Sequence, residues 1–422
     1  IHKTQQSSEF AFTNYAAFLD SVAVERHATL ALGDDGLGSS WSCQHGVARW
    51  YKHCGCHTGG DEGWNQQWRT PLRTAFQQLG ASIDALYEQT LNRLSQGTID
   101  AWALLKQYGS VVSGHQSVKD FLDRTCIRSG LPNELKPPIA RLLAAQKFKL
   151  YSFTSCGWFF SDLGGLEPRQ NIKYAVQAAS LCNGFSQEDM TGPLLGMLQS
   201  AKSNRRSDGN GQTMAKAILD AVPGHIEAAG YFLLNRRFAR PKDHVDRYGK
   251  FKLESYRDVD GERYELELHD GLILADYEVS ITMGKAPDHG YWFECESVDQ
   301  ADRSKKVVKR LSIDAIPSKM LDEVLSWIDR SLSSIGDAEV LRIATDIEHY
   351  SMLLKISRST PNEVYHTENM GTCLRALRSI FSTPNTLPWN EKRESIAGLL
   401  EFIRRRGKQS EITTATAIFS HE

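Results

Sequence analysis

The segment "WRTPLRTAFQQLGASIDALYEQTLNRL", Trp68 to Leu94, decides the fold class. Its apolar side chains recur every three or four residues, which is the period of an amphipathic helix that buries one stripe. Thr70 is a residue type that caps helices, and Pro71 is favoured in a first helical turn. The stripe consists of Leu72, Ala75, Phe76, Leu79, Ile83, Leu86 and Leu94. We therefore expect a helix that starts at about Thr70 and packs against other helices.

The same period continues along the chain. A second helix is expected from Pro137 through "IARLLAAQKFKLYSFTSCGWFFSDL", and a third from Glu167 to a left-handed stop at Gly184. In "YELELHDGLILADYEVSITM" and "GYWFECESV" apolar and polar residues alternate instead, which is typical of an antiparallel sheet. The helical period returns after Ile316. The sequence predicts a mainly α protein with a small antiparallel β insertion.

Four regions follow from these changes of pattern. We expect an N-terminal segment with a Trp/Cys/His-rich loop, a helical bundle, a small β-sheet insertion and a C-terminal helical region. Their expected bounds are 1–69, 70–240, 241–304 and 305–422.

Composition narrows the function classes. The 422 residues carry a net charge of -2, which gives no general attraction to nucleic acid or to an anionic membrane. No apolar run approaches the length of about 18 residues that a membrane-spanning helix needs. Eight cysteines without a glycosylation sequon are typical of a reducing cytoplasm, and the first residue, not a methionine, suggests a fragment or processed product. We expect a cytoplasmic protein without a nucleic-acid or membrane partner.

The segment before the first long helix is chemically unusual. "SSWSCQHGVARWYKHCGCHTGGDEGWNQQWRTPLR", Ser39 to Arg73, holds four of the nine tryptophans, three of the eight cysteines and three of the thirteen histidines. Flat rings beside imidazole and guanidinium groups suit a sugar, because a ring stacks on its C–H face and the polar groups take the hydroxyls. The alternative is that the rings cap the helical core. The expected sugar contacts are Trp41, His45, Arg49, Trp50, Trp64, Trp158 and Asp162.

Thiols and imidazoles in this segment raise the question of a metal. Cys43, Cys54 and Cys56 stand near His45, and these are ligand types that zinc prefers. The usual C-x2-C pairs are missing, so we expect buried free thiols and no resident metal or other cofactor. If the three sulfurs converge with a histidine, or with Cys156 from a distant helix, the segment is a structural zinc site instead.

A second polar constellation lies in "FTSCGWFFSDLGGLEP", Phe153 to Pro168. Asp162 and Glu167 stand close to aromatic residues and could form an acid and base pair. The other interpretation is that they are helix-end groups, since an acid in a first turn complements the helix dipole. Asp61 and Glu62 lie in a Gly-flanked turn, which is a poor place to fix a nucleophile. We expect no catalytic residue in this chain.

The Ser39–Arg73 stretch and "FTSCGWFFSDLGGLEPRQNIKYA" resemble signatures in the C-terminal region of proteins of glycoside hydrolase family 57 type, which are alpha-amylase or alpha-mannosidase-like. That region is itself a domain of unknown function in bacterial and archaeal proteins. The resemblance rests on Trp41, Cys43, His45, Gly46, Arg49, Trp50, Cys54 and Cys56. This chain departs from the pattern at Gln44 and His53.

The resemblance implies a fold and a role. Family members have an incomplete (β/α) barrel followed by a helical domain that closes one side of the substrate cleft, and they act on α-glucan with retention of configuration. Retaining hydrolysis needs two carboxyl groups about 5 Å apart, and the family takes both from the barrel. The expected partners are therefore an α-glucan or another carbohydrate and a catalytic barrel of the same polypeptide, upstream of Ile1. The alternative is a non-catalytic helical binding or assembly module, with or without structural zinc.

Overall fold

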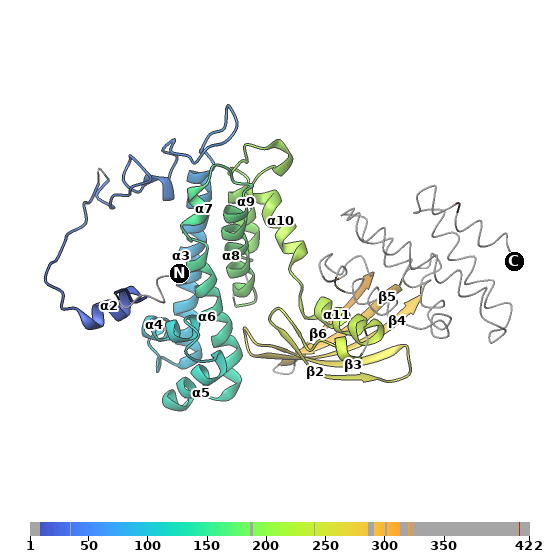
Figure 1. The fold of residues 1–422 in the computed structure, drawn as a ribbon. Coiled ribbons are helices and arrows are strands. Elements are labelled where there is room, and N and C mark those ends of the chain that lie inside the picture. The colour runs from blue at the N-terminus through green and yellow to red at the C-terminus, as the bar shows by residue number, and fades with distance from the viewer. Residues whose placement is uncertain are drawn as a thin grey trace.

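The computed structural model describes residues 9–33, 35–185, 189–239, 241–285, 291–299 and 302–312, together with Met320, Glu323 and Thr413. In these ranges the protein is a helical unit followed by a six-stranded antiparallel sheet (Figure 1). The predicted combination of helices with a small antiparallel sheet is therefore confirmed. The part of the expected C-terminal helical region that follows Ser312 lies outside the described ranges.

Long helices stand side by side in the first unit, and shorter helices lie at one end of it (Figure 1). The helices are α2 (Tyr15–Ser21), α3 (Arg69–Ser95), α4 (Ala101–Val112), α5 (Val118–Ser129), α6 (Lys136–Tyr151), α7 (Cys156–Phe159), α8 (Leu166–Cys182), α9 (Thr191–Leu198), α10 (Gly211–Ala221) and α11 (His225–Phe238). None of these helices is long and apolar enough to cross a bilayer.

Helix α3 carries the predicted stripe, and Leu72, Ala75, Phe76, Leu79, Ile83 and Leu86 are all buried. Its start differs from the prediction, because the N-cap position is Trp68 and no side chain caps the helix. The Thr70 hydroxyl instead accepts the backbone N–H of His53 at 3.0 Å. The expected cap residue therefore ties the preceding loop to the helix.

The predicted second helix is shorter than expected. Helix α6 ends at Tyr151, and the aromatic residues that follow form the separate short helix α7. The carbonyl of Thr154 leaves the helical ladder and accepts the side-chain amide of Asn171 on α8 at 2.8 Å. A Cβ on Gly157 would lie 2.2 Å from that same amide, so glycine allows α7 and α8 to approach closely. The chain therefore turns where a continuous helix was expected.

The sheet is an antiparallel meander in the strand order β1-β2-β3-β4-β5-β6. The strands are β1 (Arg247–Tyr248), β2 (Phe251–Asp258), β3 (Arg263–Asp270), β4 (Ala275–Lys285), β5 (Tyr291–Asp299) and β6 (Asp302–Ser312). In β3 the buried residues alternate with more exposed ones, as the sequence pattern predicts. The last strand runs past position 304, where the insertion was expected to end.

Two large cores stabilise these units. In the helical unit, buried residues of α3, α6, α8, α9 and α10 pack together with Trp68 and Trp158. In the sheet unit, α11 packs its buried residues against one face of the strands. Apart from Trp68 and the partly buried Trp50, the segment 39–68 contributes little to either core. Hydrogen bonds of its polar groups hold this segment in place instead.

Candidate metal centre

The segment 39–68 lies at the end of the bundle where α7 and the start of α3 meet (Figure 1). Polar contacts fix it there. The indole N–H of Trp50 donates to the carbonyl of Ser155 at 3.2 Å. The Ser161 hydroxyl accepts the N–H of Thr58 at 3.1 Å, and the Ser161 carbonyl accepts the amide of Gln66 at 3.0 Å. The loop is thus tied to the α7 region between Cys43 and Cys54 and again after Cys56.

Four potential ligands converge in this segment. One donor atom from each of Cys43, His45, Cys54 and Cys56 lies within 4.8 Å of all the others. The sulfurs of Cys43 and Cys54 are 3.8 Å apart, and the Cys56 sulfur is 3.5 Å from Nδ1 of His45. A tetrahedral zinc site with bonds of about 2.0–2.3 Å separates neighbouring donors by about 3.5–3.8 Å. The two measured separations therefore match a tetrahedral cage.

Both halves of the cluster share one local geometry. Each is a pair of ligands separated by a single residue, Cys43-x-His45 and Cys54-x-Cys56. In each pair the backbone N–H of the second ligand bonds the sulfur of the first, and the N–H of Arg49 also bonds Cys43. N–H donors to a sulfur stabilise its thiolate form, which is the form that ligates metals.

The two partner sulfurs differ in acidity. Burial would raise the pKa of the Cys43 thiol, but the backbone N–H groups of Arg49 and His45 outweigh it and lower the pKa to about 7. Burial raises the pKa of Cys54, and the neighbouring Cys43 thiolate raises it further. A divalent cation between the sulfurs would remove that repulsion and deprotonate both thiols.

Two buried cations stand beside the sulfurs. Arg69 is 0% exposed and donates to the carbonyl of Cys56 at 2.7 Å and to that of Phe160 at 3.1 Å. Arg49 is buried too, with its guanidinium 4.6 Å from the Phe159 ring centroid. Within the described part of the chain neither arginine forms an ion pair with a carboxylate. Burial lowers the pKa of Arg69 to about 10, so this side chain keeps its charge at neutral pH.

A glycine makes the first ligand pair possible. Gly46 has a φ of 67°, and a Cβ at this position would lie 2.7 Å from the carbonyl oxygen of Gly38. Only glycine fits both the left-handed conformation and the close approach. The turn directly after His45 is therefore fixed by backbone packing.

The residues expected to contact a sugar fall into two groups. Trp41 is 94% exposed, with its ring 6.4 Å from that of Phe159, and His45 is exposed too. Trp50 and Trp64 are partly buried. The Trp50 ring packs against the helical core, and Arg205 lies over the Trp64 ring. Among the expected tryptophans of the segment, Trp41 is the one whose ring is open to solvent.

The other expected sugar contacts are buried. Arg49 belongs to the surroundings of the sulfurs, and Trp158 is 0% exposed, stacked on Trp68 at 6.5 Å. Asp162 is 5% exposed, and one of its oxygens accepts from Gly164 and Ser203 while the other accepts twice from Asn204. In this structure these three side chains are enclosed by the protein.

The remaining acids and the distant cysteine lie apart from the cluster. Glu167 sits in the first turn of α8, where its charge complements the helix dipole. Asp61 and Glu62 are exposed in a turn. Cys156 is exposed at the start of α7 and does not belong to the group of converging ligands. The condition under which the sequence predicts structural zinc is therefore met with His45 as the fourth ligand.

Sequence reasoning missed Arg69 as a member of this site. No role was predicted for it from the sequence, because Gln66, Gln67 and Thr70 beside it are polar. Its burial follows from hydrogen bonds to the carbonyls of Cys56 and Phe160, which the sequence does not reveal.

Comparison with known proteins gives the part of the chain after the cluster a family description without a function. Residues 64–257 match a family model described as "Domain of unknown function (DUF3536)". The match covers α3 to α11 and most of β2, and it begins after the converging cysteines. No curated protein and no solved structure matches the chain.

Proposed function

We propose that Cys43, His45, Cys54 and Cys56 bind one structural Zn²⁺ ion, and that the chain acts as a non-catalytic binding or assembly module. The convergence of three sulfurs and one imidazole nitrogen within 4.8 Å carries this proposal. Three thiolates and one imidazole form a common structural zinc set, and four protein ligands leave no open position for a substrate. From the sequence we expected free thiols without a metal. We now propose the alternative, a structural zinc site.

Charge balance supports the proposal. Three thiolates and a dication carry a net charge of -1, which offsets one of the two positive charges of the buried guanidinium groups of Arg49 and Arg69. If the thiols were neutral, both arginines would be buried next to uncharged groups without a carboxylate, and such burial is costly. The arginines thus act as outer partners that favour the metal-bound state.

The ion would add to the order that the polar contacts give the segment. Residues 39–68 hold few buried apolar side chains, and their glycines have many conformations to lose on folding. Binding of structural zinc contributes folding free energy of about 10 kcal/mol or more in small motifs. The ion would hold the loop rigidly on α7 and present the Trp41 ring at the surface.

Metal content of designed variants tests this proposal. We expect the full chain, purified without chelator, to hold about one zinc ion per chain by mass spectrometry of the metal. Cys56→Ser should lose most of it, because a hydroxyl is a poor zinc ligand. Cys156→Ser, which changes an exposed cysteine outside the cluster, should keep it. Equal metal content in both variants would exclude these four residues as the site.

A second candidate function is sugar binding as the accessory part of a glycoside hydrolase of family 57 type. The exposed ring of Trp41 beside Phe159 favours it, since a large ring held on an ordered loop is a stacking platform for a sugar. The four hydrogen bonds at Asp162 and the helix-end position of Glu167 argue against catalysis within the chain. The two catalytic carboxylates would belong to an upstream barrel of the same polypeptide.

Titration of the full chain with maltooligosaccharides tests this second candidate. Trp41→Ala should weaken binding by about 1–3 kcal/mol, the scale of one lost stacked ring. Trp102→Ala, on the partly exposed ring of α4, serves as the matched control and should bind like the unchanged protein. Equal affinity in all three proteins would remove Trp41 from any sugar site, while the zinc proposal would stand.

A further inference from the structure

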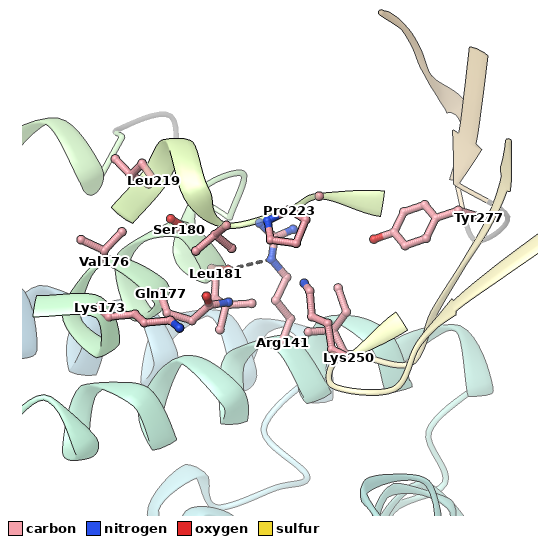
Figure 2. A pocket seen from close by; sticks show the side chains of 13 residues that line it. Arg141, Lys173, Val176, Gln177, Ser180, Leu181, Leu219, Pro223, Lys250 and Tyr277 are labelled. Carbon is pink, nitrogen blue, oxygen red and sulfur yellow. Dashed lines mark hydrogen bonds between the residues drawn. The ribbon is translucent and has the colours of Figure 1, made fainter. Parts of the chain in front are cut away.

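A cavity of about 340 Å³ opens between the helical unit and the sheet unit, far along the chain from the cysteines. Its walls come from α6, α8, the end of α10, the β1–β2 turn and β4 (Figure 2). Sites for small ligands have volumes of about 300–1,000 Å³ and lie preferentially between domains. The cavity therefore has the size and the place of a small-molecule site.

Among the residues that the structure describes, three cationic side chains line the cavity and no carboxylate does. The cations are Arg141 from α6, Lys173 from α8 and Lys250 from the β1–β2 turn. Lys250 forms an ion pair with buried Asp270 at 2.7 Å, and Asp299 attracts Arg141, but neither acid lines the space. Lys173 is exposed and has no acidic partner among the residues that the structure describes. The wall thus carries an excess of positive charge.

Arg141 is held in place by hydrogen bonds to two backbone carbonyls and by an aromatic ring. Its Nε donates to the carbonyl of Leu181 at 2.7 Å, and one terminal nitrogen donates to the carbonyl of Asn183. The aromatic ring of Phe185 lies 5.1 Å from the guanidinium carbon. A guanidinium has five N–H groups. These two hydrogen bonds therefore leave other N–H groups of Arg141 available to a ligand. Burial lowers the pKa of Arg141, against the opposing effects of Tyr277, Cys182 and Asp299.

The remaining residues that line the cavity are polar or apolar, and they indicate what the uncharged part of a ligand would look like. Hydrogen-bonding groups come from Gln177, Ser180 and Tyr277, and the Tyr277 hydroxyl points toward Arg141 and Lys250 (Figure 2). Its ring is stacked on His225 with centroids 4.1 Å apart, which holds it in position. Apolar surface comes from Val176, Leu219, Val222, Pro223 and Ile273. This mixture suits a molecule with an anionic group, several hydroxyls and an apolar ring face.

We propose that this cavity binds a small phosphate monoester with a hydroxylated body, such as a sugar phosphate. Arg141, Lys173 and Lys250 take the phosphate, because guanidinium and ammonium groups together match its charge and geometry. Gln177, Ser180 and Tyr277 take the hydroxyls, and the apolar wall takes the ring face. The site is independent of the zinc cluster and goes beyond both functions proposed above.

Calorimetric titration of the full chain with three probes tests the proposal. Glucose 6-phosphate should bind at least about tenfold more tightly than inorganic phosphate, which lacks the hydroxylated body. Glucose, which lacks the phosphate, should bind more weakly than both. Lys173→Gln removes an exposed cation from α8 without disturbing a structural bond, and it should weaken glucose 6-phosphate by about tenfold. Lys106→Gln makes the same change on the exposed face of α4 and should bind within about twofold of the unchanged protein.

A second variant separates a specific site from general charge. Arg141→Lys keeps the charge but removes the guanidinium fork, and it should also weaken glucose 6-phosphate by about tenfold. Thermal unfolding of each variant without ligand shows whether it is folded. The proposal is overturned if glucose 6-phosphate does not bind, if inorganic phosphate binds equally well, or if folded Lys173→Gln retains full affinity.

Discussion

At the scale of single residues, His225 gives the sheet unit a dependence on pH. Burial lowers the pKa of His225 below its ordinary value of 6.5, and the charge of Lys250 lowers it further, against the attraction of Glu227. The folded protein thus binds fewer protons than the unfolded chain just below pH 6.5. Stability contributed by neutral His225 is present above that pH and is lost as the pH falls toward the folded pKa.

We therefore expect the free energy of unfolding to fall as the pH decreases from about 7 to 5.5. Urea unfolding followed by tryptophan fluorescence measures this change. His225→Phe keeps a ring on Tyr277 but cannot take a proton, so its stability should vary less over the same window. A variant that loses stability with the same slope would assign the dependence to other groups.

Individual residues were predicted with mixed success, for physical reasons. The ligand types of Cys43, His45, Cys54 and Cys56 are visible in the sequence, but their convergence depends on two turns of the loop. Asp162 looked like a candidate for ligand contact because it lies among aromatic residues. Its hydrogen bonds to Ser203 and Asn204 come from a segment about forty residues away, which spacing cannot reveal.

At the scale of elements, the turn after His45 controls the cluster. Gly46→Ala would place a Cβ 2.7 Å from the Gly38 carbonyl, so the turn must shift and the His45 ligand with it. Gly36→Ala is a matched control, because Gly36 has a φ of 69° and its Cβ would meet nothing within 4 Å. Both changes cost about 1 kcal/mol of left-handed strain, but only Gly46→Ala adds a backbone clash.

Competition with a zinc-binding dye measures the difference between these two glycines. We expect Gly46→Ala to weaken zinc binding by about tenfold or more, while Gly36→Ala stays within about twofold of the unchanged protein. If both variants bound zinc equally, the turn at Gly46 would not set the position of His45.

The elements themselves were largely predictable where the apolar period is long. Helix α3 and strand β3 follow their patterns, since burial of one stripe or one face needs only local spacing. The break between α6 and α7 was missed. It depends on the amide of Asn171, which bonds the Thr154 carbonyl across two helices, and on the space that Gly157 provides.

At the scale of the whole molecule, the cores and the metal cluster stabilise different parts. The helical core around Trp68 and Trp158 and the sheet core under α11 do not include the cysteine ligands. Removal of zinc with a chelator should therefore loosen residues 39–66 and leave α3, α8 and the sheet protected. Hydrogen exchange measured by mass spectrometry tests this, and exchange that rises evenly over all described elements would contradict it.

X-ray absorption at the zinc edge of the full chain tests the central claim most directly, because it reports the atoms bound to the ion. Zinc held by Cys43, His45, Cys54 and Cys56 should show three sulfurs at about 2.3 Å and one nitrogen at about 2.0–2.1 Å. In Cys56→Ser the sulfur count should fall. A first shell of oxygen and nitrogen alone, or a protein that retains no zinc after metal is supplied, would contradict the account.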